Sequence, residues 1–215
     1  MRYLLDLFPG MLKSCGTTLS LFVWTLCLSL PLGGALSLLR VSRNKVVEKI
    51  SWAYCWFFRG TPLVLQLAFV YFGLPWLFPF LAGKRYVLAL IAFVLNYSAY
   101  FAEIFRGGIG SVGKGQFEAA DVLGFSRAQT TIRIVFPQAF KTVLPSLGNE
   151  AISLVKDTAL VYSIGIAELS RFASQAAARD FRMEPFIGAA IIYLLMTFVI
   201  SQLVGWIEGK FNYYR

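Results

Sequence analysis

Long uncharged apolar stretches dominate the pattern of hydrophobic and polar positions along the chain. Stretches without Asp, Glu, Lys or Arg cover residues 14–39, 60–83, 86–102 and 185–207. A helix needs about 20 apolar residues to cross a bilayer, so three of these stretches are long enough and the third along the chain comes close. A fifth apolar region, residues 143–167, is interrupted by charged residues. The pattern therefore predicts an all-α integral membrane protein.

We predict five transmembrane helices in one membrane domain that covers residues 1–215. Their expected bounds are about 14–39, 60–80, 86–105, 143–167 and 185–207. A polar segment, about residues 107–141, separates the third predicted span from the fourth and is too long for a simple connector.

This polar segment has the pattern of two short helices. Apolar residues recur at helical spacing between residues 116 and 123, with acidic residues on another face. Gly124 is expected to end this first helix, and Ser126 can cap a second helix that ends before Pro137. The segment is therefore predicted to form a helix-turn-helix outside the membrane.

Composition supports a lipid environment and excludes several kinds of site. The chain is 58% apolar and 14% charged, whereas a soluble domain carries roughly 25% charged residues. It has no histidine, which excludes histidine metal sites and Ser-His-Asp triads. Its three cysteines have no CxxC spacing and are interpreted as packing residues. We therefore predict no metal site and no cofactor.

The net charge of +9 could indicate nucleic acid, but the placement of the charges favours another explanation. If the segment between the first two spans lies in the cytoplasm, the cytoplasmic segments carry more Lys and Arg than the outer segments, and Arg215 is one of the cytoplasmic residues. This excess predicts an outside N-terminus and a cytoplasmic C-terminus. No nucleic-acid partner is expected.

The stretch GIGSVGKG, Gly108 to Gly115, contains the GxxxxGK spacing of a phosphate-binding loop. A phosphate-binding loop needs Ser or Thr where this chain has Gly115. Such a loop also follows a buried strand, whereas the segment in this chain follows a predicted membrane helix. We interpret the glycines as a flexible turn at the membrane exit and predict no ATP site in this chain.

Polar residues in the fourth predicted span fall on one helical stripe, at steps of three and four. The stripe contains Ser146, Asn149, Glu150, Ser153, Lys156 and Asp157. A charge at mid-membrane costs roughly 2.5–3.5 kcal/mol, so the stripe must face protein or water. Two interpretations stay open. The charges pair with neighbouring helices, for instance Lys156 with Glu103, or they line a path for a solute.

Further candidates lie in the second and third predicted spans. Asn96 is near the middle of the third span and suits either a helix contact or a solute contact. Glu103 lies one turn before Arg106, which predicts an intrahelical pair. At the inner end of the second span, Pro62 can break the helix. The candidate gate residues there are Arg59, Thr61 and Pro62. The candidate pathway residues are Asn96, Glu103, Asn149, Glu150, Ser153, Lys156 and Asp157.

The polar segment also resembles a known motif. Glu118-Ala119-Ala120, three residues, Gly124, nine residues, Ile134, one residue and Phe136-Pro137 are similar to the EAA loop of ABC-importer permeases. The family has Leu at the position of Phe136. Further blocks resemble the polar amino acid uptake group of these permeases. They are FRGTPLVLQL (58–67), NYSAYFAEIFRGGI (96–109), PSLGNE (145–150) and LVKDTALVYSIG (154–165).

The resemblance implies an importer subunit of a bacterial cytoplasmic (inner) membrane. Two permease chains, identical or paralogous, would form an alternating-access pathway for polar amino acids, driven by two ATPase subunits and fed by an extracytoplasmic binding protein. The EAA helix would sit in a cleft of the ATPase. The direction of transport, import, is also implied by the resemblance to this family. The residues expected to couple the permease to the ATPase are Glu118, Ala119, Ala120, Gly124, Ile134 and Pro137.

Two other functions compete with this interpretation. An ion-coupled carrier or channel would use the charged fourth span without an ATPase, but it would leave the EAA segment unexplained. An intramembrane enzyme could use Ser153 with Lys156 as a serine–lysine pair, because three residues of separation place both on one helix face. The sequence shows no element that would donate hydrogen bonds to an oxyanion.

Overall fold

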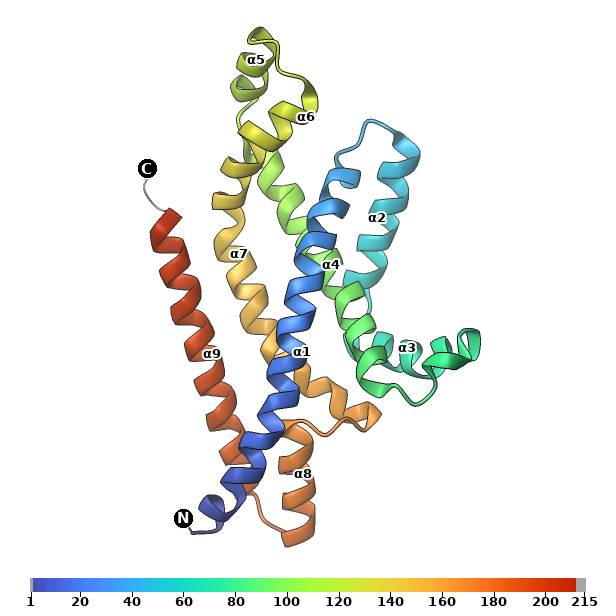
Figure 1. Ribbon diagram of the computed structural model, residues 1–215, viewed down its shortest axis with the longest axis vertical. Coiled ribbons are helices and arrows are strands. Elements are labelled where there is room, and N and C mark those ends of the chain that lie inside the picture. Colours follow the sequence, from blue (N-terminus) through green and yellow to red (C-terminus); the bar gives the residue numbers. More distant parts are fainter. Residues whose placement is uncertain (1, 212–215) are drawn as a thin grey trace.

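The computed structural model describes residues 2–211, and every regular element within that range is helical (Figure 1). The α-helices are α1 (Arg2–Arg40), α2 (Lys45–Gly60), α3 (Leu63–Leu77), α4 (Arg85–Ser111), α5 (Lys114–Val122), α6 (Arg127–Thr130), α7 (Phe136–Asp157), α8 (Leu169–Asp180) and α9 (Glu184–Phe211). Two 3₁₀ segments, Pro79–Leu81 and Thr158–Ile164, and a π-helical turn, Thr131–Val135, complete them. Arg215, which was expected in the cytoplasm, lies outside the described residues.

Three helices are long and apolar enough to cross a membrane within the described residues: α1, α4 and α9. They contain the predicted ranges 14–39, 86–105 and 185–207 and extend beyond each of them. α1 continues through Pro9 and Pro31, which membrane helices tolerate more readily than soluble ones.

The second predicted span, 60–80, is not one helix. α2 ends at Gly60, α3 begins at Leu63, and the two are bent by 106°; taken together they would make a fourth span. Pro62 explains the break, because proline has no backbone N–H and fixes its own φ, so it starts α3 instead of continuing α2. Sequence reading missed α2 because Lys45 and Lys49 interrupt its apolar pattern.

The fourth predicted span, 143–167, also differs from the structure. α7 begins earlier, at Phe136, and ends at Asp157, after which the chain forms the 3₁₀ segment. The expectation that a helix ends before Pro137 is wrong, since the backbone stays helical from Arg127 through the π-helical turn into α7. The widened turn relieves the clash that a proline ring makes in a regular α-helix. That α7 crosses the membrane as a fifth span stays a prediction.

α4 forms the centre of the bundle. It packs against α1, α2, α3 and α7 (Figure 1). Phe93, Tyr97 and Phe101 of α4 are almost fully buried and hold the core together. By contrast, α9 is largely exposed and carries apolar side chains such as Leu194 and Phe198 on its surface. This exposed apolar surface suits contact with lipid, because lipid tails are as apolar as leucine.

The predicted helix-turn-helix is present at one end of the bundle (Figure 1). Gly124 follows α5 with φ of 73°, a left-handed conformation that favours glycine. Ser126 caps α6 in a capping box with Gln129, so the predicted turn and cap are confirmed. The predicted exit turn at Gly108–Gly115 is wrong in extent. α4 continues to Ser111, and only two residues separate it from α5.

Candidate functional site

A polar cavity of about 620 Å³ lies where the break between α2 and α3 faces α4 and the end of α7. Its lining residues are Arg59, Gly60, Thr61, Pro62, Leu63, Asn96, Tyr97, Tyr100, Glu150, Ser153, Asp157 and Leu160. All three candidate gate residues and four of the candidate pathway residues therefore meet in one place. The break lies beside the middle of α4, so the candidate gate residues stand at a bend rather than at the end of a straight span.

The broken backbone is stabilised by two side-chain amides. Gln66 donates hydrogen bonds to the carbonyl oxygen of Phe58 (2.8 Å) and to the carbonyl oxygen and hydroxyl of Thr61 (3.0 and 2.7 Å). Asn96 donates to the carbonyl oxygen of Phe58 and to Gln66 Oε1, both at 3.0 Å. Irregular backbone is tolerated at membrane depth only where its polar groups are satisfied. The amide group of Asn96 is thus used to hold the break together.

Carboxylates form the opposite wall of the cavity. Asp157 Oδ2 accepts a hydrogen bond of 2.7 Å from the hydroxyl of Tyr97. Glu150 and Ser153 lie two turns and one turn before Asp157 on α7, respectively, and line the same space. Glu150 makes no hydrogen bond or ion pair within residues 2–211. Two carboxylates across from Arg59 provide complementary charges for a small solute that carries both an anionic and a cationic group.

The predicted stripe on α7 divides into two groups. Glu150, Ser153 and Asp157 line the cavity, whereas Ser146, Asn149 and Lys156 are exposed and do not. The described residues contain no hydrogen bond between Ser153 and Lys156, so the serine–lysine pair is not formed. Spacing of three and four residues defines a wide helical face, and only packing decides which part of that face a cavity meets.

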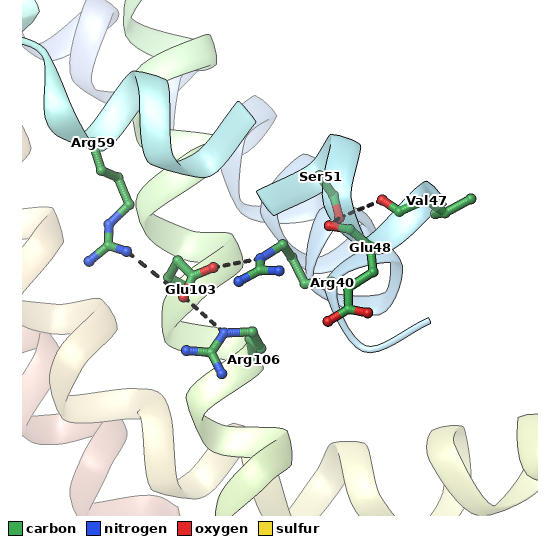
Figure 2. A network of polar contacts seen from close by, with 7 residues as sticks. All are labelled: Arg40, Val47, Glu48, Ser51, Arg59, Glu103 and Arg106. Carbon is green, nitrogen blue, oxygen red and sulfur yellow. Dashed lines mark hydrogen bonds and ion pairs between the residues drawn. The ribbon is translucent and has the colours of Figure 1, made fainter. Parts of the chain in front are cut away.

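Glu103 lies at the centre of a separate cluster of arginines (Figure 2). Its Oε1 accepts from Arg40 Nε at 2.8 Å, and its Oε2 accepts from Arg106 Nε at 2.8 Å. Arg59 Nη1 lies 3.8 Å from the same Oε2. The predicted pair with Arg106 is confirmed, and the suggested pair with Lys156 is wrong. Glu103 also does not line the cavity, although it was a candidate pathway residue.

Sequence reasoning missed several residues of the site. Gln66, Tyr97 and Tyr100 were not singled out, and Arg40 was not recognised as a partner of Glu103. Gln66 had a usable signal, because it is the one amide side chain in the uncharged stretch 60–83.

The hairpin of α5 and α6, together with the π-helical turn and the first turn of α7, carries the expected coupling residues and several exposed apolar side chains. Ala120 is buried, Ile134 is half-buried, and Glu118, Ala119, Gly124 and Pro137 are exposed. Next to them, Val122, Leu123 and Ile132 are 87%, 72% and 68% exposed. Exposed apolar side chains on a segment outside the predicted spans are typical of an interaction surface.

A helical bundle with a lipid-facing surface, a polar cavity at a broken helix and an exposed hairpin defines a membrane transport component. Residues 29–213 match the family described as "Binding-protein-dependent transport system inner membrane component", and the chain belongs to this family. It is accordingly an inner-membrane transport component with helical spans rather than an enzyme. Membership implies, in general terms, a binding protein and a separate ATPase as partners.

Individual relatives agree with this assignment. The chain is 38% identical over 213 residues to the probable amino-acid ABC transporter permease protein PatM of Vibrio harveyi, covering 98% of this chain and 96% of PatM. It is 39% identical over 203 residues to the arginine transport system permease protein ArtQ of Bacillus subtilis, covering 94% and 92%. A solved structure titled as an amino acid ABC transporter with histidines has a TM-score of 0.88 and 34% identity, covering 97% of both chains.

Proposed function

We propose that this chain is the permease subunit of an ABC importer and that, with a second permease chain, it forms an alternating-access pathway for polar amino acids. Two ATPase subunits drive the pathway, and an extracytoplasmic binding protein delivers the solute. The observation that carries this proposal is the cavity at the broken helix, where Arg59 faces Glu150 and Asp157. These groups match the carboxylate and ammonium of an amino acid.

Within this class, we favour amino acids with a basic side chain. The cavity wall formed by α7 carries two carboxylates, Glu150 and Asp157, against the single arginine of the α2–α3 break. One carboxylate can therefore receive the α-ammonium group and the other a side-chain cation. Two similar permeases are named for arginine and for nopaline transport, which supports the same class.

The exposed polar side of α7 supports a second permease chain. Asn149 and Lys156 are exposed in the single chain and do not belong to the cavity wall. A lysine in a membrane-spanning helix is costly against lipid and is therefore expected to face protein or water. A second chain packed against this side of α7 provides that environment and encloses the pathway between the two copies.

The hairpin is the proposed docking surface for the ATPase. Its exposed apolar residues, Val122, Leu123 and Ile132, accompany the EAA residues. Because a coupled transporter needs differential contacts in its two states, the hairpin must contact the ATPase differently before and after nucleotide-driven closure. The helical backbone that joins the hairpin to α7 carries this movement to the cavity.

Five crossings with the N-terminus outside and the C-terminus in the cytoplasm agree with the arrangement of the chain. The hairpin and the end of α9 lie at one end of the bundle, whereas the start of α1 and α8 lie at the other (Figure 1). Contacts support both ends: Phe140 packs on Phe211 near the hairpin, and Tyr3 donates a 2.6 Å hydrogen bond to Asp180.

Substrate-stimulated ATP hydrolysis tests the proposal. The permease would be reconstituted in proteoliposomes with its ATPase and binding protein, and hydrolysis screened across amino acids. We expect a response to basic amino acids that falls strongly in Glu150→Gln and Asp157→Asn. Thr197→Val, a half-buried position on α9 outside the cavity wall, is the matched control. Uptake by the isolated chain without ATPase would instead support an ion-coupled carrier or channel.

A further inference from the structure

We propose that Arg59 receives the carboxylate of the transported amino acid and that Glu103 is the positioning residue that holds Arg59 for this purpose. The inference rests on the proposed function and extends it. It names the group that recognises the carboxylate end of the solute, and it gives a role to an intramembrane acid that lies outside the cavity wall.

The three arginines around Glu103 are held unequally (Figure 2). Arg40 and Arg106 each donate an Nε hydrogen bond of 2.8 Å, to different oxygens of the carboxylate. Arg59 approaches only to 3.8 Å and makes no hydrogen bond within residues 2–211. Its guanidinium thus retains its donors. The Glu103 carboxylate keeps two strong partners whether or not Arg59 stays beside it.

A second contact fixes the direction of the Arg59 side chain. Its guanidinium carbon lies 5.4 Å from the centroid of the Tyr100 ring, within the range of a cation–π contact. Tyr100 is one turn before Glu103 on α4, and both Tyr100 and Arg59 line the cavity. The side chains of Arg59 and Arg106 are 44% and 43% exposed, against 10% for Arg40, and of the three only Arg59 lines the cavity. Arg59 is therefore the arginine of the cluster that a solute can reach.

The charges of the cluster favour a second anion. Three guanidinium groups surround one carboxylate, which leaves excess positive charge beside the cavity. A free carboxylate can bind the planar guanidinium through two parallel hydrogen bonds, which is stronger than the present contact at 3.8 Å. Arg59 can therefore bind the solute carboxylate with its free donors while Glu103 keeps its guanidinium in place, and Glu150 and Asp157 remain opposite it for the cationic groups.

Without Glu103, Arg59 loses the negative charge that holds it near Arg40 and Arg106. The two remaining arginines repel its guanidinium, so the side chain is displaced from the position in which it meets a carboxylate. A residue that acts in this way changes recognition of the carboxylate group in particular. A simple brace between α1 and α4 would affect every ligand of the cavity alike.

The test measures binding of radiolabelled L-arginine and of agmatine, which is arginine without its carboxylate, to the purified permease–ATPase complex. We expect Glu103→Gln to weaken L-arginine binding about tenfold, the change that corresponds to one charge-assisted contact, and to leave agmatine binding almost unchanged. Glu103→Asp should retain most of the L-arginine affinity. In an Arg59→Gln background, Glu103→Gln should add nothing further.

Glu48→Gln is the matched control, because Glu48 lies near the cluster in Figure 2 but pairs with Lys45 at 2.8 Å and does not line the cavity. Arg59→Lys, at a half-exposed position, gives an independent measurement: loss of the planar fork should also reduce the preference for L-arginine over agmatine. Equal weakening of both ligands, unchanged L-arginine binding, or additive effects in the double variant would overturn the inference. A wild-type complex that binds no amino acid would instead contradict the proposed pathway itself.

Discussion

The side-chain amide of Asn96 donates a 3.0 Å hydrogen bond to the carbonyl oxygen of Phe58, 38 positions earlier in the chain. This bond joins the central helix α4 to the last turn of α2, where the helix is broken. The cavity exists because the chain changes direction there, and the carbonyl groups that the break exposes are bound by amides of the protein itself.

Gln66→Leu tests how much this arrangement contributes to stability. Gln66 is 5% exposed, and leucine has a similar size but cannot donate to Phe58 or Thr61. The carbonyl oxygen of Phe58 keeps its hydrogen bond from Asn96, but the carbonyl oxygen of Thr61 loses its donor. A buried acceptor left without a partner costs about 1–3 kcal/mol, which lowers the melting temperature by about 2–4 °C per kcal/mol in a chain of this size. Thermal unfolding of the purified complex measures the change. Thr197→Val should have no comparable effect, and an unchanged melting temperature in Gln66→Leu would show that the break needs no amide.

Gly108→Ala tests the contact between α4 and α7. A Cβ atom at Gly108 would overlap the side chain of Val143 and lie 3.0 Å from the carbonyl oxygen of Ala139. We expect a loss of about 1–3 kcal/mol in the free energy of unfolding, as for other overpacked sites. Gly107→Ala is an ideal neighbour for comparison, because nothing lies within 4 Å of its Cβ.

The same contact predicts that the effects of Gly108→Ala and Val143→Ala on the free energy of unfolding are not additive. If the overlap with Val143 is the cause, Gly108→Ala should cost less in a Val143→Ala background than in the wild type. Equal costs in both backgrounds would assign the effect to the Ala139 carbonyl instead. Unfolding curves of the four proteins in one detergent give the comparison.

Gly124→Val tests the hairpin turn. Space around Gly124 is open, so the effect comes from its φ of 73°, which costs an L-residue roughly 1–2 kcal/mol. We expect normal membrane insertion with loss of uptake, because the turn sets how α5 is presented to the ATPase. Gly110→Val, in a helical position with open space, should keep uptake. Full uptake by Gly124→Val would argue against a coupling role for the hairpin.

Glu168 predicts a pH dependence of stability at the opposite end of the bundle. Burial raises the pKa of its carboxyl group, although the backbone N–H groups of Ser170 and Arg171 and the hydroxyl of Tyr193 donate to it. The folded state therefore binds the proton more tightly than the unfolded state. The resulting stabilisation is complete below the ordinary pKa of about 4.3 and is lost as the pH rises through the raised value.

Melting temperatures of the wild type and Glu168→Gln between pH 4 and 7 check this. The advantage of the wild type over the variant should shrink as the pH rises. Asp180→Asn, measured at pH values below 4, should show the opposite trend, since hydrogen bonds from Arg179 and Tyr3 hold the pKa of Asp180 below its ordinary value. Its stabilisation is present above that ordinary value and is lost as the pH falls below it. Parallel curves for the wild type and Glu168→Gln would contradict the prediction.

Features that depend on local sequence were the ones that could be predicted. The turn at Gly124 and the cap at Ser126 follow from the preferences of a few adjacent residues, and the structure contains both. Uncharged stretches likewise located α1, α4 and α9, because a lipid solvent excludes charge over a whole helix.

Features that depend on direction or distant pairing could not be predicted. Hydropathy counts apolar residues but does not record a bend, so a break at Pro62 was expected at the end of the second span, and its direction and its place beside the middle of α4 were not predicted. The pair of Glu103 with Arg106 was predicted, but Lys156 was suggested where Arg40 is the second partner, because Arg40 lies 63 positions away and meets Glu103 only once α1 packs on α4. The cavity combines both difficulties, since it needs the bend and the packing together.

The π-helical turn at Thr131–Val135 sets the rotational phase between the hairpin and the cavity. An α-helix advances 100° per residue, since 3.6 residues complete a turn. Removing one residue from this turn would restore regular winding and rotate α6 by about that angle around the axis of α7. The surface proposed to dock the ATPase would then point elsewhere while Asp157 kept its place, so a change in the length of this short segment is expected to separate the hairpin's orientation from that of the cavity.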